Sequence, residues 1–250
     1  MQRRTFLKAA LSTIILPISI VRVHAAIDDL AARIAAAKVS ADRRLYLPAG
    51  DYILPAGIML DVSGLEVVGD GIGRTRLICD GLAINGTVKL LTLNADRITL
   101  RDLTIVITNA SGVGTLVAVA CDWNCTHPRL SRIEVIGGYG TTNAGGAGFT
   151  FYRQPLTDRA QQYAVVEDCV VHDAPLSCGF IINSNANSFV RCESRDLGTL
   201  VGQHGYYIQG GLNSFRDCRA VRVKGYSFNA TCNVPNQDGS ANLFDGCTSI

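Results

Sequence analysis

Three short stretches near the C-terminus are near copies of one another, and they limit what the chain can fold into. They read NSFVRC (187–192), NSFRDC (213–218) and NLFDGC (242–247), and AVVEDC (164–169) ends in the same way. The four marker cysteines that close them are Cys169, Cys192, Cys218 and Cys247, at intervals of 23, 26 and 29 residues. A period of about 20–30 residues indicates a solenoid, in which each repeat forms one coil and stacks on the next.

A second phrase recurs between the markers and indicates that the repeats are made of strands. It consists of Gly followed by alternating apolar residues: GFTFY (148–152), GFIIN (179–183), GYYIQ (205–209) and GYSFN (225–229). Alternation with a period of two is typical of strands, and no helix-length pattern separates the phrases. Leucine-rich repeats would need Leu-rich phrases and helical backs. The sequence therefore predicts an all-β protein, a parallel β-helix whose coils stack about 4.8 Å apart.

The repeat also predicts what fills the interior. Equivalent residues of successive coils form ladders, so Phe189, Phe215 and Phe244 are expected to stack inside, and so are the four marker cysteines. A buried cysteine behaves as a small apolar residue, and we expect these four to be free thiols. Disulfides between neighbouring coils are the alternative, because the strand spacing lies within their reach. The chain has nine cysteines, so at least one has no partner within the chain.

The N-terminus has the three-part layout of an export signal. Residues 1–25 comprise a basic start, an apolar run and a small-residue cleavage site that ends at Ala25. Arg3-Arg4, followed by Thr-Phe-Leu-Lys, resembles a twin-arginine signal, which exports folded proteins; an ordinary export signal with two arginines is the alternative. Cleavage after Ala25 predicts a periplasmic or secreted protein. The apolar run is too short for a membrane span of about 20 residues, so none is expected in the mature chain.

Charge argues against nucleic acid as a partner. Removal of residues 1–25 leaves 19 basic and 21 acidic residues, a formal charge of −2, and no Lys- or Arg-rich cluster remains. Binding to a phosphate backbone needs such a cluster.

The coils resemble the right-handed parallel β-helix proteins of the pectate-lyase type, and with the signal they resemble a group of uncharacterised exported β-helix repeat proteins. RRLYLPAGDYIL (43–54), LEVVGDGIGRTRLI (65–78) and ADRITLRDLTI (95–105) are similar to the opening coils of that superfamily. The resemblance implies a short capping helix within 26–41, where Ile27, Leu30 and Ile34 share one face, and a β-helix over 42–250. The chain ends in mid-coil at Ile250, which predicts an incomplete solenoid.

The Gly phrases predict a polar wall on one sheet. The first and third residues after each Gly should point inward, and the second and fourth outward. The outward residues are then Thr150, Ile181, Tyr207 and Ser227 in one column, and Tyr152, Asn183, Gln209 and Asn229 in the next. His204 and Lys224 stand just before Gly and are expected beside this wall. The alternative is an amide ladder that satisfies turns, with both cations merely solvated.

Two functions fit this wall, and the sequence leaves open whether the protein is an enzyme. The first is a lyase that cleaves acidic polysaccharide by β-elimination, with His204 as base, Tyr207 as acid, Lys224 steadying the anion and Asn183, Gln209, Asn229 and Tyr152 binding substrate. A glycoside hydrolase needs paired carboxylates, which the predicted wall lacks, and a uronate epimerase is also less favoured. The second is a non-catalytic protein that binds glycan or builds the cell envelope.

No metal or cofactor is predicted. CDWNCTH (121–127) brings Cys121, Cys125 and His127 together without a second ligand pair at zinc spacing, so a polar loop or a local disulfide is expected. Asp173 and Asp196 fall at equivalent places after their markers, with His172, Arg195 and Arg222 near them. Two carboxylates are too few for calcium, so alternating charges on a solvated face are expected.

Overall fold

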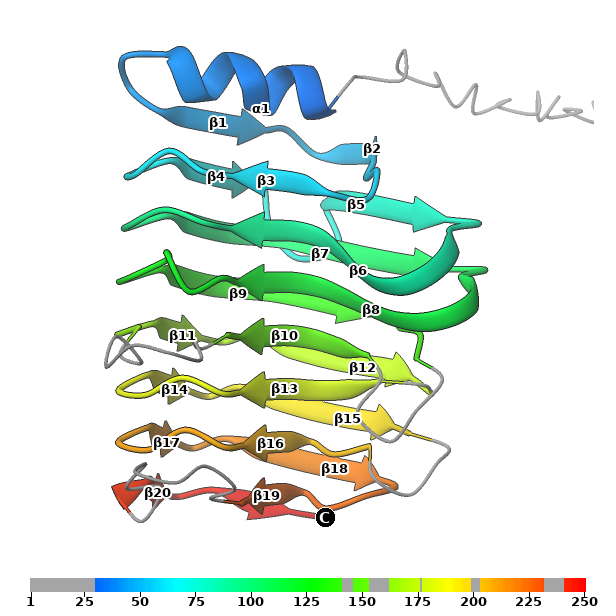
Figure 1. Ribbon diagram of the computed structural model, residues 1–250, viewed down its shortest axis with the longest axis vertical. Coiled ribbons are helices and arrows are strands. Elements are labelled where there is room, and N and C mark those ends of the chain that lie inside the picture. The colour runs from blue at the N-terminus through cyan, green and yellow to red at the C-terminus, as the bar shows by residue number, and fades with distance from the viewer. Residues whose placement is uncertain (1–29, 141–145, 153–161, 176, 199–202, 232–240) are drawn as a thin grey trace, which may run out of the picture.

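The computed structural model describes residues 30–140, 146–152, 162–175, 177–198, 203–231 and 241–250. Within them one helix, α1 (Leu30–Val39), precedes strands whose pairing in two sheets is parallel throughout. In Figure 1 the strands in front run to the left and those behind run to the right while the chain descends from α1, so the coil is right-handed. The right-handed parallel β-helix with a short N-terminal helix is therefore confirmed.

Each coil contributes one strand to a seven-stranded sheet and one or two to a fourteen-stranded sheet. The seven-stranded sheet holds β3 (Ile58–Leu60), β6 (Ala83–Leu93), β8 (Ser111–Cys121), β10 (Ala147–Phe151), β13 (Cys178–Ile182), β16 (Tyr206–Ile208) and β19 (Phe228–Ala230). The fourteen-stranded sheet holds β1 (Arg44–Leu47), β2 (Gly50–Ile53), β4 (Glu66–Gly69), β5 (Thr75–Asp80), β7 (Thr99–Thr108), β9 (Arg129–Ile136), β11 (Val165–Glu167), β12 (Val170–Ala174), β14 (Ser188–Val190), β15 (Glu193–Leu197), β17 (Ser214–Arg216), β18 (Arg219–Val223), β20 (Leu243–Asp245) and β21 (Thr248–Ser249).

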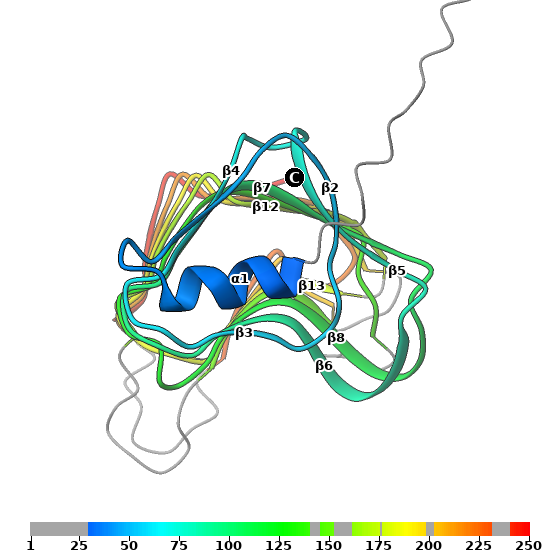
Figure 2. The same cartoon turned by 90° about the horizontal axis from the view of Figure 1, so that it is seen from above.

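Helix α1 lies across the N-terminal end of the coil, as Figure 2 shows. It buries Leu30, Ile34 and Ala37, one apolar stripe at helical spacing. Ile27 and the predicted export signal lie outside the described residues. No helix in the described part of the chain is long and apolar enough to cross a membrane.

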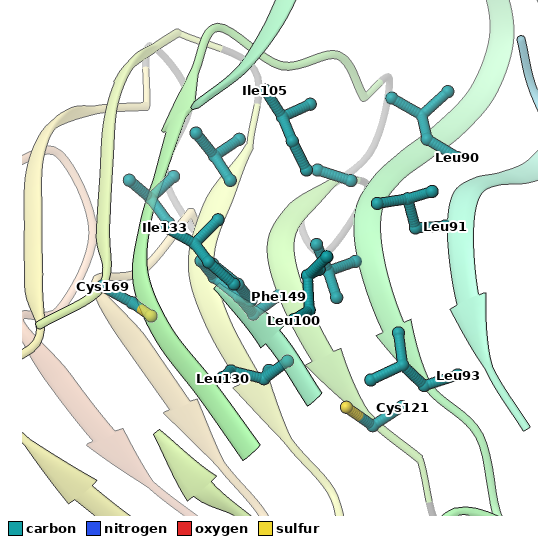
Figure 3. Close-up of a cluster of buried hydrophobic side chains, with 14 of the residues drawn as sticks. Leu90, Leu91, Leu93, Leu100, Ile105, Cys121, Leu130, Ile133, Phe149 and Cys169 are labelled. Atoms are coloured by element: carbon teal, nitrogen blue, oxygen red, sulfur yellow. The ribbon is translucent and has the colours of Figure 1, made fainter. Parts of the chain in front are cut away.

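The interior is filled by ladders of like residues. Phe189 stacks on Phe215 with ring centroids 4.9 Å apart, and Phe215 stacks on Phe244 at the same spacing, so the predicted aromatic ladder is confirmed. Phe244 is 40% exposed because it belongs to the last described coil. Toward the N-terminus the same interior is packed with aliphatic side chains around Phe149, as Figure 3 shows. Only like-shaped residues stack well at the strand spacing, and that constraint explains the repeated Phe.

The described cysteines are free thiols, as the sequence predicted for the four markers. Cys169, Cys192 and Cys218 are buried, and the Cys192 thiol donates to the carbonyl of Val166 at 3.4 Å. Burial raises the pKa of Cys192 well above its ordinary value, which keeps the sulfur protonated and unreactive.

The asparagines that begin three of the repeat phrases form a hydrogen-bonded ladder that the sequence did not assign. The Asn213 side-chain oxygen accepts from the backbone N–H of Asn187 and from its Nδ2, each at 3.0 Å. Asn187 in turn accepts from the N–H of Ala164, and Asn242 accepts from the N–H of Asn213. Buried backbone donors at the corner are satisfied by the next coil, which explains why Asn recurs before each Phe.

The glycine of the second phrase is required by the close approach of the two sheets. A Cβ atom on Gly148 would lie 2.4 Å from Val171 Cγ2, and one on Gly179 would lie 2.0 Å from Ser194 Oγ. Gly205 meets Ala220 in the same way. These glycines are therefore conserved within the chain's own repeats by packing rather than by a turn.

Charged residues of opposite sign pair along the outside of the fourteen-stranded sheet. Arg222 binds Asp196 through two contacts of 2.6 Å and lowers the pKa of that carboxyl. The register sets Asp196 beside Asp173 in the next coil, and the two carboxylates bind different partners, Arg222 and His172. The predicted alternation of charge is confirmed. Arg191 holds Asp168 in the same two-point manner at 2.7 and 2.8 Å.

Candidate functional site

The outer face of the seven-stranded sheet carries the predicted wall, which is polar in part and in which Val117, Ala120, Ala147, Thr150 and Cys178 are buried. From β6 to β19 its outward residues form three columns: Lys89, Val117, Ala147, Cys178, His204 and Tyr226; Thr92, Ala120, Thr150, Ile181, Tyr207 and Asn229; and Asn94, Asp122, Tyr152, Asn183, Gln209 and Thr231. We call these three columns the outer wall. Its coils are about 4.8 Å apart, so the wall extends about 24 Å along the axis.

The last Gly phrase is out of step with the other three, which corrects part of the prediction. Tyr206 pairs with Phe228 rather than with Tyr226, a shift of two residues. Ser227 therefore takes the position of the glycines and faces Ser249, with their oxygens 2.5 Å apart, instead of pointing outward. Tyr226, predicted inside, is 69% exposed. The prediction aligned the four phrases on their glycines. In this coil the position where the two sheets come close together is held by Ser227 instead of a glycine.

The amide and phenol column is confirmed for three of its four members. Tyr152, Asn183 and Gln209 follow strands that pair in successive coils. Asn229 instead lies opposite Tyr207, one column away. The Gln209 Nε2 group donates to the Tyr207 hydroxyl at 3.0 Å, so that oxygen is held while its own proton stays available. The Asn183 side-chain oxygen is buried and has no hydrogen-bond partner among the described residues.

His204 is fixed in one protonation state by its neighbours. Its Nδ1 accepts from the backbone N–H of Tyr226 at 3.0 Å, and its Nε2 lies 3.1 Å from the side-chain amide of Asn229, which satisfies an Nε2–H donor when the amide oxygen is turned toward the ring. A neutral ring that accepts at Nδ1 carries its proton on Nε2. Burial lowers the pKa of His204, and the ring lies between those of Tyr207 and Tyr226, with centroids 5.4 and 5.5 Å away. His204 thus has no free lone pair with which to accept a proton.

Lys224 is not brought beside His204. Its backbone N–H bonds the carbonyl of Leu197, which places it directly after β18 at the end of the fourteen-stranded sheet. The residue is exposed and lies at the corner rather than on the outer wall. The predicted alignment of His204 with Lys224 is therefore wrong, since Tyr226 occupies the position next to His204.

The structure adds an ion pair that the sequence did not assign to the wall. Lys89 Nζ lies 3.1 Å from Asp122 Oδ2 and 4.3 Å from the centre of the Tyr152 ring. Burial raises the pKa of Tyr152, so its phenol stays neutral. The wall therefore contains one carboxylate where the sequence predicted none. Strict alternation in TVKLLTL (87–93) would put Lys89 on the inward face with Leu91 and Leu93. Leu90 and Leu91 both face the core and break that alternation, so the sequence gives no signal for the outward Lys89.

A second polar cluster lies on the other sheet. His172 contacts Glu134 through Nε2 at 3.0 Å and Asp173 through Nδ1 at 2.7 Å. Thr104 donates to the second oxygen of Glu134. In the described residues no group of three or more His, Cys, Asp or Glu side chains is arranged to hold a metal ion.

Comparison with known proteins identifies the fold. No protein-family model and no curated protein sequence matches the chain. The A-module of the mannuronan C-5 epimerase AlgE6 of Azotobacter vinelandii is 18% identical, with a TM-score of 0.63 over 87% of this chain and 61% of its own. The pre-mature gene product 12 of bacteriophage phi29 is 15% identical, with a TM-score of 0.62 over 82% and 29%.

The catalytic domain of a GH87 α-1,3-glucanase, in complex with nigerose, is 16% identical, with a TM-score of 0.54 over 83% of this chain and 41% of its own. The chain thus spans from under a third to under two thirds of the length of these structures. Such low identities show a shared fold alone. The chain is a parallel β-helix protein, and its function has to be argued from its own wall.

Proposed function

We propose that the protein is a polysaccharide-active β-helix protein that binds an extended glycan along the outer wall. The observation that carries this proposal is the run of Tyr152, Asn183 and Gln209 in successive coils, with Tyr207 and Tyr226 beside it. A polysaccharide repeats its hydroxyl groups along its length, and amides and phenols can both donate to and accept from hydroxyls. Tyrosine rings add a flat apolar surface with a polar tip.

Two further points support the proposal. Two of the similar folds belong to carbohydrate-active proteins, the epimerase and the glucanase. The twin-arginine pattern in residues 1–25 favours a periplasmic or secreted protein, where it would meet cell-envelope or environmental glycans.

The β-elimination reaction that the sequence favoured has less support than glycan binding alone. His204 has both ring nitrogens engaged, so it is a poor base. Elimination also needs a cation at the substrate carboxylate. On the wall that cation is Lys89, whose ammonium lies at Tyr152, two coils or about 10 Å from Tyr207. Tyr207, whose hydroxyl proton is available, is the residue on which an elimination would depend. The geometry favours binding over cleavage.

Replacement of Tyr207 by alanine is expected to weaken polysaccharide binding by about 10-fold or more, the effect of losing one central aromatic contact. Affinity electrophoresis against a panel of neutral and acidic polysaccharides measures the loss. Ultraviolet absorbance of unsaturated products in the same samples reports elimination. The matched control is Tyr46→Ala, a tyrosine of β1 that is 50% exposed on the other sheet. Binding that Tyr207→Ala leaves intact, or a panel without a single ligand, would show the proposal to be wrong.

A further inference from the structure

We propose that the Lys89–Asp122 pair makes the outer wall electrically neutral and selects a neutral, hydroxyl-rich polysaccharide over a polyuronate. This inference rests on the proposed glycan binding and names the substrate class of that same wall.

The pair crosses the wall diagonally. Lys89 starts in the column of Val117 and Ala147, yet its ammonium reaches Asp122 and Tyr152, two columns away. The Lys89 side chain is 27% exposed and that of Asp122 15%, so both charges are largely withdrawn from water. The Lys89 ammonium donates a hydrogen bond to the Asp122 carboxylate and also lies over the face of the Tyr152 ring, a cation–π contact. The cation is thus compensated by its own neighbours.

The rest of the described wall carries no charge. Of the residues in its three columns from β6 to β19, Lys89 and Asp122 are the charged ones, and they cancel. His204 is neutral for the reasons given above, because burial lowers its pKa and Nδ1 accepts a backbone hydrogen. The remaining polar groups are amides and hydroxyls.

The polar groups that the wall presents suit hydroxyls better than carboxylates. The phenols of Tyr207 and Tyr226 and the amide of Gln209 are at least partly exposed, and each can both donate to and accept from a sugar hydroxyl, whereas an ionised carboxylate only accepts. The Asn183 side-chain oxygen is buried and is not one of these groups. A uronate laid on the wall would also lose water from its charge and face the carboxylate of Asp122, and no uncompensated cation of the wall's described residues offsets that loss. A neutral glycan has no charge to desolvate and is not repelled by the Asp122 carboxylate.

The experiment compares a neutral gluco-hexasaccharide with a hexauronate by calorimetry on the full protein. The wild-type protein is expected to bind the neutral ligand at least about 10-fold more tightly. Asp122→Asn removes the compensating charge and frees Lys89, so the ratio of neutral to acidic affinity is expected to fall about 10-fold, the scale of one charge-assisted hydrogen bond. Lys89→Met added to Asp122→Asn should restore the preference. Asp168→Asn, which frees Arg191 on the other sheet in the same way, should change neither affinity.

The outcomes are distinct. Tighter binding of the hexauronate by the wild-type protein would overturn the inference and leave glycan binding standing. An equal gain of uronate affinity in Asp168→Asn would also overturn it, because the effect would then be one of net charge. Failure of neutral and acidic ligands alike, in calorimetry and in the polysaccharide panel, would remove the proposed function and this inference together.

Discussion

Replacing Tyr206 by alanine is expected to lower the free energy of unfolding by about 3–5 kcal/mol, the usual cost of deleting a buried aromatic ring. Tyr206 is fully buried and stacks between Phe180 and Phe228, with ring centroids 4.9 and 4.6 Å away. Its hydroxyl donates to the carbonyl of Cys192 at 2.7 Å. The truncation therefore interrupts the aromatic ladder and removes one of the two donors to that carbonyl, which keeps the backbone N–H of Arg219.

The next residue is the matched control. Tyr207 is half-buried on the outer wall, and its replacement by alanine should cost less than about 1 kcal/mol. Urea denaturation followed by circular dichroism compares the two variants. Equal destabilisation by both substitutions would mean that the inward and outward faces of β16 have been misassigned.

Replacing Asn213 by alanine is expected to lower the free energy of unfolding by about 2–4 kcal/mol. The Asn213 oxygen accepts from two donors of Asn187, and its Nδ2 donates to the carbonyl of Ser184. Removing the side chain leaves a buried N–H and a buried carbonyl unsatisfied, each at a cost of about 1–3 kcal/mol. The measurement is again the midpoint of urea denaturation.

Asn183→Ala is the control for this prediction, because Asn183 lies on the outer wall and its side-chain oxygen has no partner among the described residues. It should change stability by less than about 0.5 kcal/mol. An Asn213→Ala variant as stable as the wild type would show that the asparagine ladder does not hold the corner between the sheets.

The sequence predicted those parts of the molecule that repeat. Phe189, Phe215 and the marker cysteines recur in the same phrase, so one coil predicts the next, and the interior ladder follows from the strand spacing. The alternation of GYYIQ placed Tyr206 inside and Tyr207 outside, and both placements are confirmed.

The parts that depend on pairing between unlike coils could not be predicted. Gly225 was aligned with Gly205, but the close approach of the sheets admits Ser227 there, and the register moves by two residues. That shift carries Asn229 to another column and Lys224 to the corner. Lys89 and Asp122 share no phrase, and their contact exists only because β6, β8 and β10 fall in one register. The roles of the site residues stay predictions.

The central claim is that glycan lies on the outer face of the seven-stranded sheet, and hydroxyl-radical labelling of tyrosine side chains tests it most directly. With a polysaccharide found by the binding panel, the account predicts reduced labelling of Tyr152, Tyr207 and Tyr226. Labelling of Tyr46, which is 50% exposed on the fourteen-stranded sheet, should not change. Protection of Tyr46 with unchanged labelling at Tyr207 and Tyr226 would contradict the account, because the bound glycan would then lie on the other sheet.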